Sequence, residues 1–224
     1  MRYRLLMACA AVAISTTAAH AQWYAGPTLF GGMSDNDDLN RTPATAFPFS
    51  GGAGDTGWSG GIGALAGYDF SKTEKLPFAL ELGGNYRFRH DMNIRYTDPS
   101  NTILYGAKSN VQAADLILSA IYDLPLGTTS WQPFIGGGAG VAHIMLDTDT
   151  TGVGNSGNTN TSQTNFAWQG QAGVKVPLDE DMKLRVEYRY IDYGDISTGL
   201  LTTGDRFDAS FYSHDLRLGL TWDF

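Results

Sequence analysis

The last stretch of the chain, residues 211–224, ends in an alternation of apolar and polar residues that runs from Asp215 to Phe224. The apolar register consists of Leu216, Leu218, Leu220, Trp222 and Phe224. The residues between them are polar or small, namely Asp215, Arg217, Gly219, Thr221 and Asp223. A period of two is typical of an extended strand with one apolar face. Because this stretch also ends on an aromatic residue, it suits a strand that closes a barrel in a membrane.

Seven further segments show the same alternation, at residues 23–33, 57–70, 77–89, 111–124, 131–145, 165–176 and 183–193. The first is the least regular and contains Pro27, which cannot donate to a strand ladder. The long connections are residues 34–56, 90–110, 146–164 and 194–210, and the short ones are residues 71–76, 125–130 and 177–182. Alternating short turns and long loops between an even number of strands indicate a transmembrane barrel. The sequence therefore predicts an all-β fold, an eight-stranded antiparallel up-and-down transmembrane β-barrel with both termini on the periplasmic side.

Aromatic residues on the apolar face gather near the two ends of the predicted strands. The group expected at the periplasmic end is Trp23, Tyr68, Phe70, Phe78, Tyr122, Trp131, Trp222 and Phe224. The group expected at the outer end is Trp58, Tyr86, Phe88, Phe166, Trp168, Tyr188, Tyr190 and Tyr212. Two aromatic girdles around an aliphatic belt are typical of a protein in a bilayer. A soluble sandwich or lipocalin-like barrel would turn this face inward and gives no reason to sort tryptophans by height.

The start of the chain has the pattern of a secretory signal peptide. Arg2 and Arg4 precede a short apolar run, and a small-x-small cleavage site ends at Ala21. The predicted signal peptide is residues 1–21, and residues 22–224 are expected to form one barrel domain. The single cysteine lies within the signal peptide. The remaining 13 basic and 23 acidic residues give a net charge of −10, which argues against nucleic acid as a partner.

The polar face of the strands carries charges of both signs, which a membrane barrel turns into its lumen. The predicted lumen set is Glu81, Arg87, Arg89, Asp115, Asp123, Lys175, Arg185, Glu187, Arg189, Asp215 and Arg217. These side chains could line an ion pathway, or they could pair with one another as a plug. Eight strands enclose an interior just wide enough for side chains, and mixed signs suit pairing, so the sequence favours the plug.

Candidate chemistry is sparse. The histidines His90, His143 and His214 fall near the predicted outer rim, and Ser213 adjoins the last of them. Such residues act as acids, bases and nucleophiles in enzymes, but no nucleophile motif accompanies them here. The sequence predicts no enzyme activity, no catalytic site, no metal site and no cofactor. An enzyme that modifies lipid A at the rim is the less favoured alternative.

Six segments resemble, in this order, the small outer-membrane β-barrel family of opacity-type and short-chain porin family proteins: GGIGALAGYDF, SAIYDLP, WQPFIGGGAGVAHI, FAWQGQAGVKV, LRVEYRYIDYG and SHDLRLGLTWDF. The resemblance covers essentially the whole chain after the signal peptide, and YDLP followed by QPFIGGGAG is its most specific part. It implies an eight-stranded barrel in the outer membrane of a Gram-negative bacterium and brings no shared catalytic residues. The final LGLTWDF is similar to the C-terminal signal for the barrel-assembly machinery, which would comprise Leu218, Leu220, Trp222 and Phe224. Pro27 and a third loop rich in Gly, Asn and Thr depart from the family pattern.

These patterns together predict a structural outer-membrane barrel that displays four long extracellular loops and serves envelope integrity and surface interaction. The expected partners are outer-membrane lipid and lipopolysaccharide, the barrel-assembly machinery during biogenesis, and a host or surface ligand that the loops bind. A narrow porin for small solutes is the main alternative.

Overall fold

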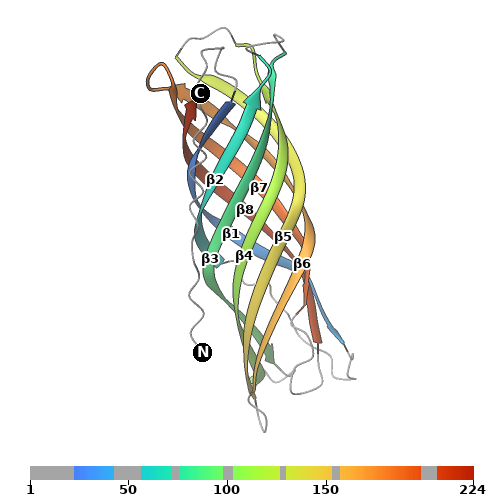
Figure 1. Cartoon of the computed structure of the whole chain (residues 1–224). Coiled ribbons are helices and arrows are strands. Elements are labelled where there is room, and N and C mark those ends of the chain that lie inside the picture. Colours follow the sequence, from blue (N-terminus) through green and yellow to red (C-terminus); the bar gives the residue numbers. More distant parts are fainter. Residues whose placement is uncertain are drawn as a thin grey trace, which may run out of the picture.

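The computed structural model describes residues 23–42, 57–71, 76–97, 103–126, 130–152, 157–197 and 206–224. Its strands are β1 (Trp23–Thr42), β2 (Gly57–Asp69), β3 (Phe78–Thr97), β4 (Ile103–Asp123), β5 (Gln132–Gly152), β6 (Gly157–Pro177), β7 (Met182–Ser197) and β8 (Arg206–Asp223). Each strand pairs antiparallel with the next, and β8 pairs back with β1 to close the barrel (Figure 1). The described residues include no helix of the length and hydrophobicity needed to cross a membrane. The predicted fold class is confirmed, whereas the predicted signal peptide lies outside the described residues.

The strands are staggered around the barrel. A path of directly paired residues can be followed around the barrel, with one residue from each strand. The path starts at Ala25 of β1 and returns to β1 at Asp35, ten positions further along the chain. With strands ~4.8 Å apart and a rise of ~3.3 Å per residue, this stagger corresponds to a tilt of about 40°. An eight-stranded barrel of this tilt has an interior that side chains can fill.

Side chains alternate between the two faces of the wall, and the apolar ones point outward. On β8, Leu216 is 60% exposed and Leu218 is 42% exposed, whereas Asp215 and Arg217 between them are buried. A soluble barrel would show the reverse arrangement, with apolar residues inside. The apolar outer face is stable only where something other than water covers it, as the hydrocarbon of a bilayer does.

The strands are longer than the alternation predicted. The connections expected at residues 90–110 and 146–164 are largely strand, because β3 continues to Thr97, β4 begins at Ile103, β5 continues to Gly152 and β6 begins at Gly157. The alternation missed the extensions of β5 and β6 because nearly every residue from 147 to 164 is polar or glycine, so hydrophobicity no longer has a period of two. In β3, Met92, Ile94 and Tyr96 continue the alternation, and the prediction ended that strand too early. The tips of the long connections lie outside the described residues.

At the long-connection end, the wall divides into two sheets. Backbone pairing between β6 and β7 ends at Trp168 and Asp192 among the described residues. On the other side, β2 stops pairing with β1 at Gly57 and with β3 at Gly61. Beyond these points β3, β4, β5 and β6 continue as one sheet, and β7, β8 and β1 continue as another (Figure 1).

Side-chain amides bridge β6 to β7 just beyond the last backbone pair. Asn165 Nδ2 donates to the carbonyl oxygens of Tyr193 and Asp195 at 3.0 and 2.6 Å, and Gln163 Nε2 donates to that of Asp195 at 2.6 Å. The β7 backbone bulges here, and Gly194 has a φ of 74°, a conformation that favours glycine. These amides replace part of the missing ladder.

The closing contact between β1 and β8 is tight at Gly26. A Cβ at this position would lie 1.7 Å from the carbonyl oxygen of Leu220. That oxygen belongs to the backbone of β8, so it cannot move without disturbing the strand pairing that closes the barrel. Gly31 of the same strand is different, because its nearest neighbour, the carbonyl oxygen of Ser59, would be 4.0 Å from a Cβ.

Replacing Gly26 with alanine is therefore expected to remove most of the closed barrel, whereas Gly31→Ala should leave it intact. A closed β-barrel resists SDS at room temperature, so the fraction that migrates differently before and after boiling reports closure. Equal folded fractions for the two variants would contradict the tight contact at Gly26.

Candidate functional site

The interior of the barrel is the candidate site, because buried charged side chains gather there from the inward faces of β3, β4, β7 and β8. Asp215 of β8 lies at one centre of this network. It accepts two hydrogen bonds from Arg87 Nη2, at 2.7 and 2.6 Å, and two from Arg189, at 2.8 Å from Nη2 and 3.2 Å from Nε. Ser213 donates a further bond at 2.9 Å. All these side chains are fully buried, so the two guanidinium groups depend on this carboxylate for compensation.

A second centre lies nearer the short turns. Arg185 of β7 crosses the lumen to Glu81 of β3, where Nη1 donates to both carboxylate oxygens at 2.7 and 2.8 Å. Its Nε donates to Glu187 at 2.7 Å, and its guanidinium group lies 4.5 Å from the centre of the Phe134 ring. Tyr24 donates to Glu81 at 2.9 Å. This centre therefore ties β1, β3, β5 and β7 together across the interior.

The mouth of the lumen at the short-turn end carries two more ion pairs. Lys175 pairs with Asp123 at 2.7 Å, and Lys183 pairs with Asp223 at 2.8 Å. A cavity of about 10 Å³ lies beside Tyr24, Lys175 and Arg185. This volume has room for roughly one water molecule.

Five cations and five anions form ion pairs within the described lumen, and Asp69 lines the cavity at its short-turn mouth in addition. Apart from the Lys183–Asp223 pair, the cations are Arg87, Lys175, Arg185, Arg189 and Arg217, and the anions are Glu81, Asp115, Asp123, Glu187 and Asp215. We name this set of five cations and five anions the charged tier. Within this tier, Arg217 forms an ion pair with Glu187 at 2.9 Å, and Asp115 forms one with Arg189 at 3.7 Å. The side-chain amide of Asn85 also donates a hydrogen bond to Asp115 at 2.6 Å.

Arg89 does not lie in the lumen, contrary to the sequence prediction. Its side chain is 51% exposed and pairs with Asp147 of β5 at 3.4 Å. The pairing of β3 with β4 shifts register between Arg87 and His90, and this irregularity breaks the strict alternation of faces. No local pattern of residues marks this shift.

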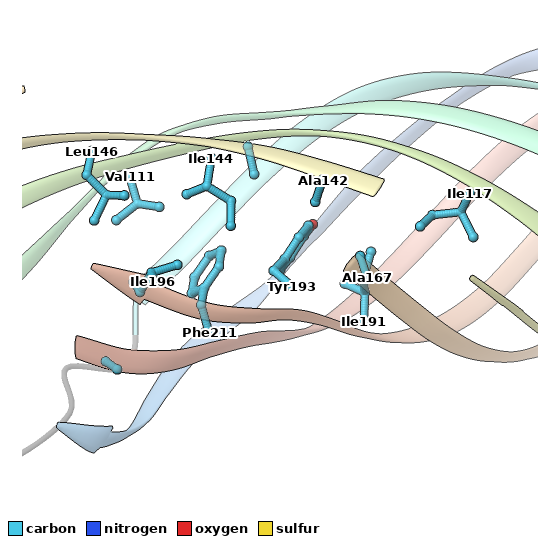
Figure 2. Close-up of a cluster of buried hydrophobic side chains, with 12 residues drawn as sticks. Val111, Ile117, Ala142, Ile144, Leu146, Ala167, Ile191, Tyr193, Ile196 and Phe211 are labelled. Carbon is cyan, nitrogen blue, oxygen red and sulfur yellow. The ribbon is translucent and has the colours of Figure 1, made fainter. Parts of the chain in front are cut away.

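A second set of interior residues is apolar and lies towards the long-connection end. We name it the apolar tier; its members are Val111, Ala113, Ile117, Ala142, Ile144, Leu146, Ala167, Ile191, Tyr193, Ile196, Ala209 and Phe211. Figure 2 shows side chains from β4 and β5 facing those from β7 and β8 across the lumen. The rings of Tyr193 and Phe211 stack with centroids 5.0 Å apart. Every member is buried, so this tier fills its part of the lumen.

Tyr193 joins the two tiers. Its ring belongs to the apolar tier, while its hydroxyl accepts a hydrogen bond from Arg87 Nε at 3.3 Å. The predicted lumen set contained only charged residues, and the apolar tier was not predicted as a group because hydrophobic residues occupy both faces of these strand segments. On β5, for example, exposed Val141 is followed by buried Ala142 and Ile144.

The predicted aromatic residues lie on the outward face. Near the short turns, Trp23, Tyr68, Phe70 and Phe78 form a chain of ring contacts, with centroids 5.1, 4.8 and 4.6 Å apart. Towards the other end, Trp58 and Phe166 are the most exposed, at 74% and 67%. Tyr190 contacts the rings of Trp168 at 5.3 Å and Tyr212 at 5.9 Å.

The remaining girdle residues, Tyr86, Phe88, Tyr122, Trp131, Tyr188, Trp222 and Phe224, are also exposed. In the proposed C-terminal signal, Leu218, Trp222 and Phe224 are exposed and Leu220 is half-buried. The backbone N–H of Phe224 donates to the carbonyl of Trp23 at 2.9 Å, so the last residue contributes to closure.

The rim residues Ser213 and His214 lie on opposite faces of the wall. Ser213 is buried and faces the lumen, whereas His214 is exposed on the outer face, because neighbours in a strand point to opposite sides. His214 Nδ1 instead shares a 2.5 Å hydrogen bond with the hydroxyl of Tyr188, and His143 Nδ1 shares one of 3.0 Å with Thr164. The side chain of His90 lies outside the described residues. In the described part of the chain, no three His, Cys, Asp or Glu side chains are placed to hold a metal ion.

Several interior residues were not predicted. Tyr24, Asn85, Lys183 and Asp223 take part in the polar contacts described above, and Gln169 donates to Ser119 at 3.0 Å. Their position on the polar face of a strand was a usable signal for all but Tyr24. Tyr24 belongs to the irregular first segment, where the alternation was weakest.

Replacing Asp215 with asparagine should destabilise the barrel strongly, because the substitution preserves shape but leaves Arg87 and Arg189 without their shared counter-charge. Removing one partner of a buried pair costs about 3–5 kcal/mol. The control is Asp147→Asn, which breaks the exposed pair with Arg89 and should cost about 0–1 kcal/mol. Urea unfolding in lipid vesicles measures both free energies, and equal losses would show that the buried network is not needed for stability.

Comparisons with known proteins agree with this geometry. A family model described as the outer membrane protein beta-barrel domain matches residues 6–224. Outer membrane protein PagN of Salmonella typhimurium strain LT2 is 29% identical over 177 residues, which cover 73% of this chain and 72% of PagN. The crystal structure of outer membrane protein OprG from Pseudomonas aeruginosa has a TM-score of 0.50 at 18% identity, with 91% of this chain and 96% of that chain covered. Neisserial surface protein A has a TM-score of 0.47 at 16% identity, with 90% and 97% covered. At these identities the structural likeness shows the fold alone.

Proposed function

Because the chain belongs to the outer membrane protein beta-barrel domain family, we propose that it is a structural outer-membrane barrel that displays its long-connection end at the cell surface. The observation that supports this proposal is the burial of the side chains that point into the lumen. The charged tier and the apolar tier together occupy the interior that the structure describes. A barrel closed in this way serves as a rigid support and does not let solutes pass. Its interactions are then made by its outer surface and its loops.

The orientation follows from the connections. In outer-membrane barrels the short turns face the periplasm and the longer connections face outside. The start of β1 and the end of β8 lie at the short-turn end (Figure 1), so both termini are proposed to be periplasmic. The two sheets beyond the barrel would then stand above the membrane surface.

The outer surface supports contact with outer-membrane lipid and lipopolysaccharide. Exposed aromatic rings surround the barrel at the outer girdle, where the acyl region of a bilayer meets its headgroups. On β3 and β4, exposed Arg89 and Lys108 provide cations for phosphate groups, and Asp147 and Asp91 hold them in place at 3.4 and 2.6 Å. A host or surface ligand would be bound by the loops that the two sheets carry.

The role is proposed to be non-catalytic. The opposite orientations of Ser213 and His214 support this, as does the hydrogen bond that engages His214 with Tyr188. A narrow porin is the alternative function, and it requires a continuous path through both tiers.

Purified protein in planar bilayers is expected to give no reproducible step-like openings, because the apolar tier excludes hydrated ions. Replacing Tyr193 and Phe211 together with alanine removes the stacked pair and should raise the rate of openings at least several-fold. The control, Tyr212→Ala, removes a ring from the outer face and should give no step-like openings. Stable openings from the unmodified protein would refute the closed lumen and favour the porin.

The C-terminal strand is proposed to be the segment that the barrel-assembly machinery binds. Deleting Phe224 should lower the amount of barrel in the outer membrane several-fold, while barrels that do fold keep a nearly unchanged urea midpoint. Phe224→Tyr keeps a terminal aromatic ring and should restore normal amounts. Quantitative blotting of outer-membrane fractions measures the effect, and equal amounts of deleted and unmodified protein would exclude the signal role.

A further inference from the structure

The lumen has a local space at Gly83. This residue faces inward on β3, between Glu81 and Asn85, and a Cβ placed on it has no other atom within 4 Å. Other interior glycines differ sharply, because a Cβ at Gly138 or Gly173 would lie 2.3 or 2.4 Å from neighbouring atoms. A side chain therefore has room at Gly83 that it lacks at Gly138 and Gly173.

Two guanidinium groups reach the residues on either side of this space. Arg185 crosses the lumen to Glu81, and Arg217 Nη2 crosses it to Asn85 Oδ1 at 3.1 Å. Glu187 lies between the two arginines on the opposite wall. Its Oε2 accepts from Arg185 Nε at 2.7 Å, and its Oε1 lies 2.9 Å from Arg217 Nη1. We refer to Arg185, Glu187 and Arg217 as the triangle; its two arginines contact the residues that flank Gly83 on β3.

Each member of this triangle has one buried polar atom that lacks a hydrogen-bond partner in the described part of the chain. These atoms are Arg185 Nη2, Glu187 Oε1 and Arg217 Nε. The 2.9 Å approach of Arg217 Nη1 to Glu187 Oε1 is an ion pair without the direction of a hydrogen bond. The side chains are only 3–5% exposed, so bulk water does not satisfy them. Unsatisfied buried polar atoms in native proteins are rare, and an internal water is a common partner for them.

The donor and acceptor pattern selects the class of ligand. The unpartnered atoms are two N–H groups and one carboxylate oxygen on neighbouring side chains, and a water molecule can accept from donors of this kind while donating to the acceptor. An anion would be repelled by Glu81 and Glu187, and a metal ion would be repelled by Arg185 and Arg217. We propose that the charged tier contains an internal water site beside Gly83, bounded by Arg185, Glu187 and Arg217.

The site has a route of entry from the short-turn end. Arg185 lines both the triangle and the cavity of about 10 Å³ beside Tyr24 and Lys175, a volume that suits roughly one water. The apolar tier closes the other side, so water enters and leaves from one end of the barrel. The site depends on the ion-paired interior and not on the surface role proposed above, so either proposal can fail alone.

The test compares valine and threonine, which have the same shape, at position 83. Valine fills the space but leaves the three polar atoms unsatisfied, whereas the threonine hydroxyl substitutes for water. Gly83→Val is therefore expected to have an unfolding equilibrium constant roughly tenfold higher than Gly83→Thr, since an unsatisfied buried polar group is costly. Gly170 of β6 is the matched control, because it faces outward and a Cβ there also has nothing within 4 Å. At position 170, valine should be at least as stable as threonine.

Urea unfolding in vesicles provides the comparison, and valine as stable as threonine at position 83 would overturn the proposal. If Gly83→Val does not fold, NMR of the unmodified barrel in lipid nanodiscs decides. The Arg217 Nε proton should show a cross peak to water that is absent for a buried backbone amide of β4. Lack of that cross peak would likewise exclude the site.

Discussion

Backbone pairing is the constraint on which this structure depends. A strand in hydrocarbon has no water to satisfy its N–H and C=O groups, so an open edge within the membrane is not tolerated. The pairing of β8 with β1 removes that edge, although Pro27 withholds one donor and Gly26 must approach the β8 backbone closely. The stagger and tilt of the strands follow from closing eight of them, and the width of the lumen follows from the tilt.

The narrow lumen in turn determines what the interior can contain. Charged side chains placed there are out of contact with bulk water, so each needs a counter-charge from another strand. The network provides these by reaching across the barrel, as Arg87 of β3 does to Asp215 of β8 and Arg185 of β7 does to Glu81 of β3. Such pairs are weak contributors to net stability, but they specify which strands face each other. The apolar tier fills the remaining part with packed side chains, which need no partners of opposite charge.

Sequence alternation was enough to predict the strand count, the closed topology and the direction in which most side chains point. It failed where apolar and polar residues do not mark the two faces of a strand. Arg89 follows a register irregularity in β3, which no local pattern reveals. The extensions of β5 and β6 are polar or glycine at nearly every position, and Ile144 and Phe211 belong to segments that are apolar on the inside. The partner of each charge was also beyond prediction, because Arg185 and Glu81 are separated by 104 positions in the chain and meet only through the curvature of the wall.

The division of the wall beyond Trp168 and Asp192 separates the long connections into two groups. Residues 98–102 and 153–156 join strands within the sheet of β3 to β6, whereas residues 198–205 join β7 to β8 in the other sheet. No backbone ladder links the two sheets there among the described residues. Insertions or exchanges in one group therefore impose no change of register on the other. The amides of Gln163 and Asn165 and the side chains of the apolar tier still connect the two sheets, so the separation concerns backbone pairing alone.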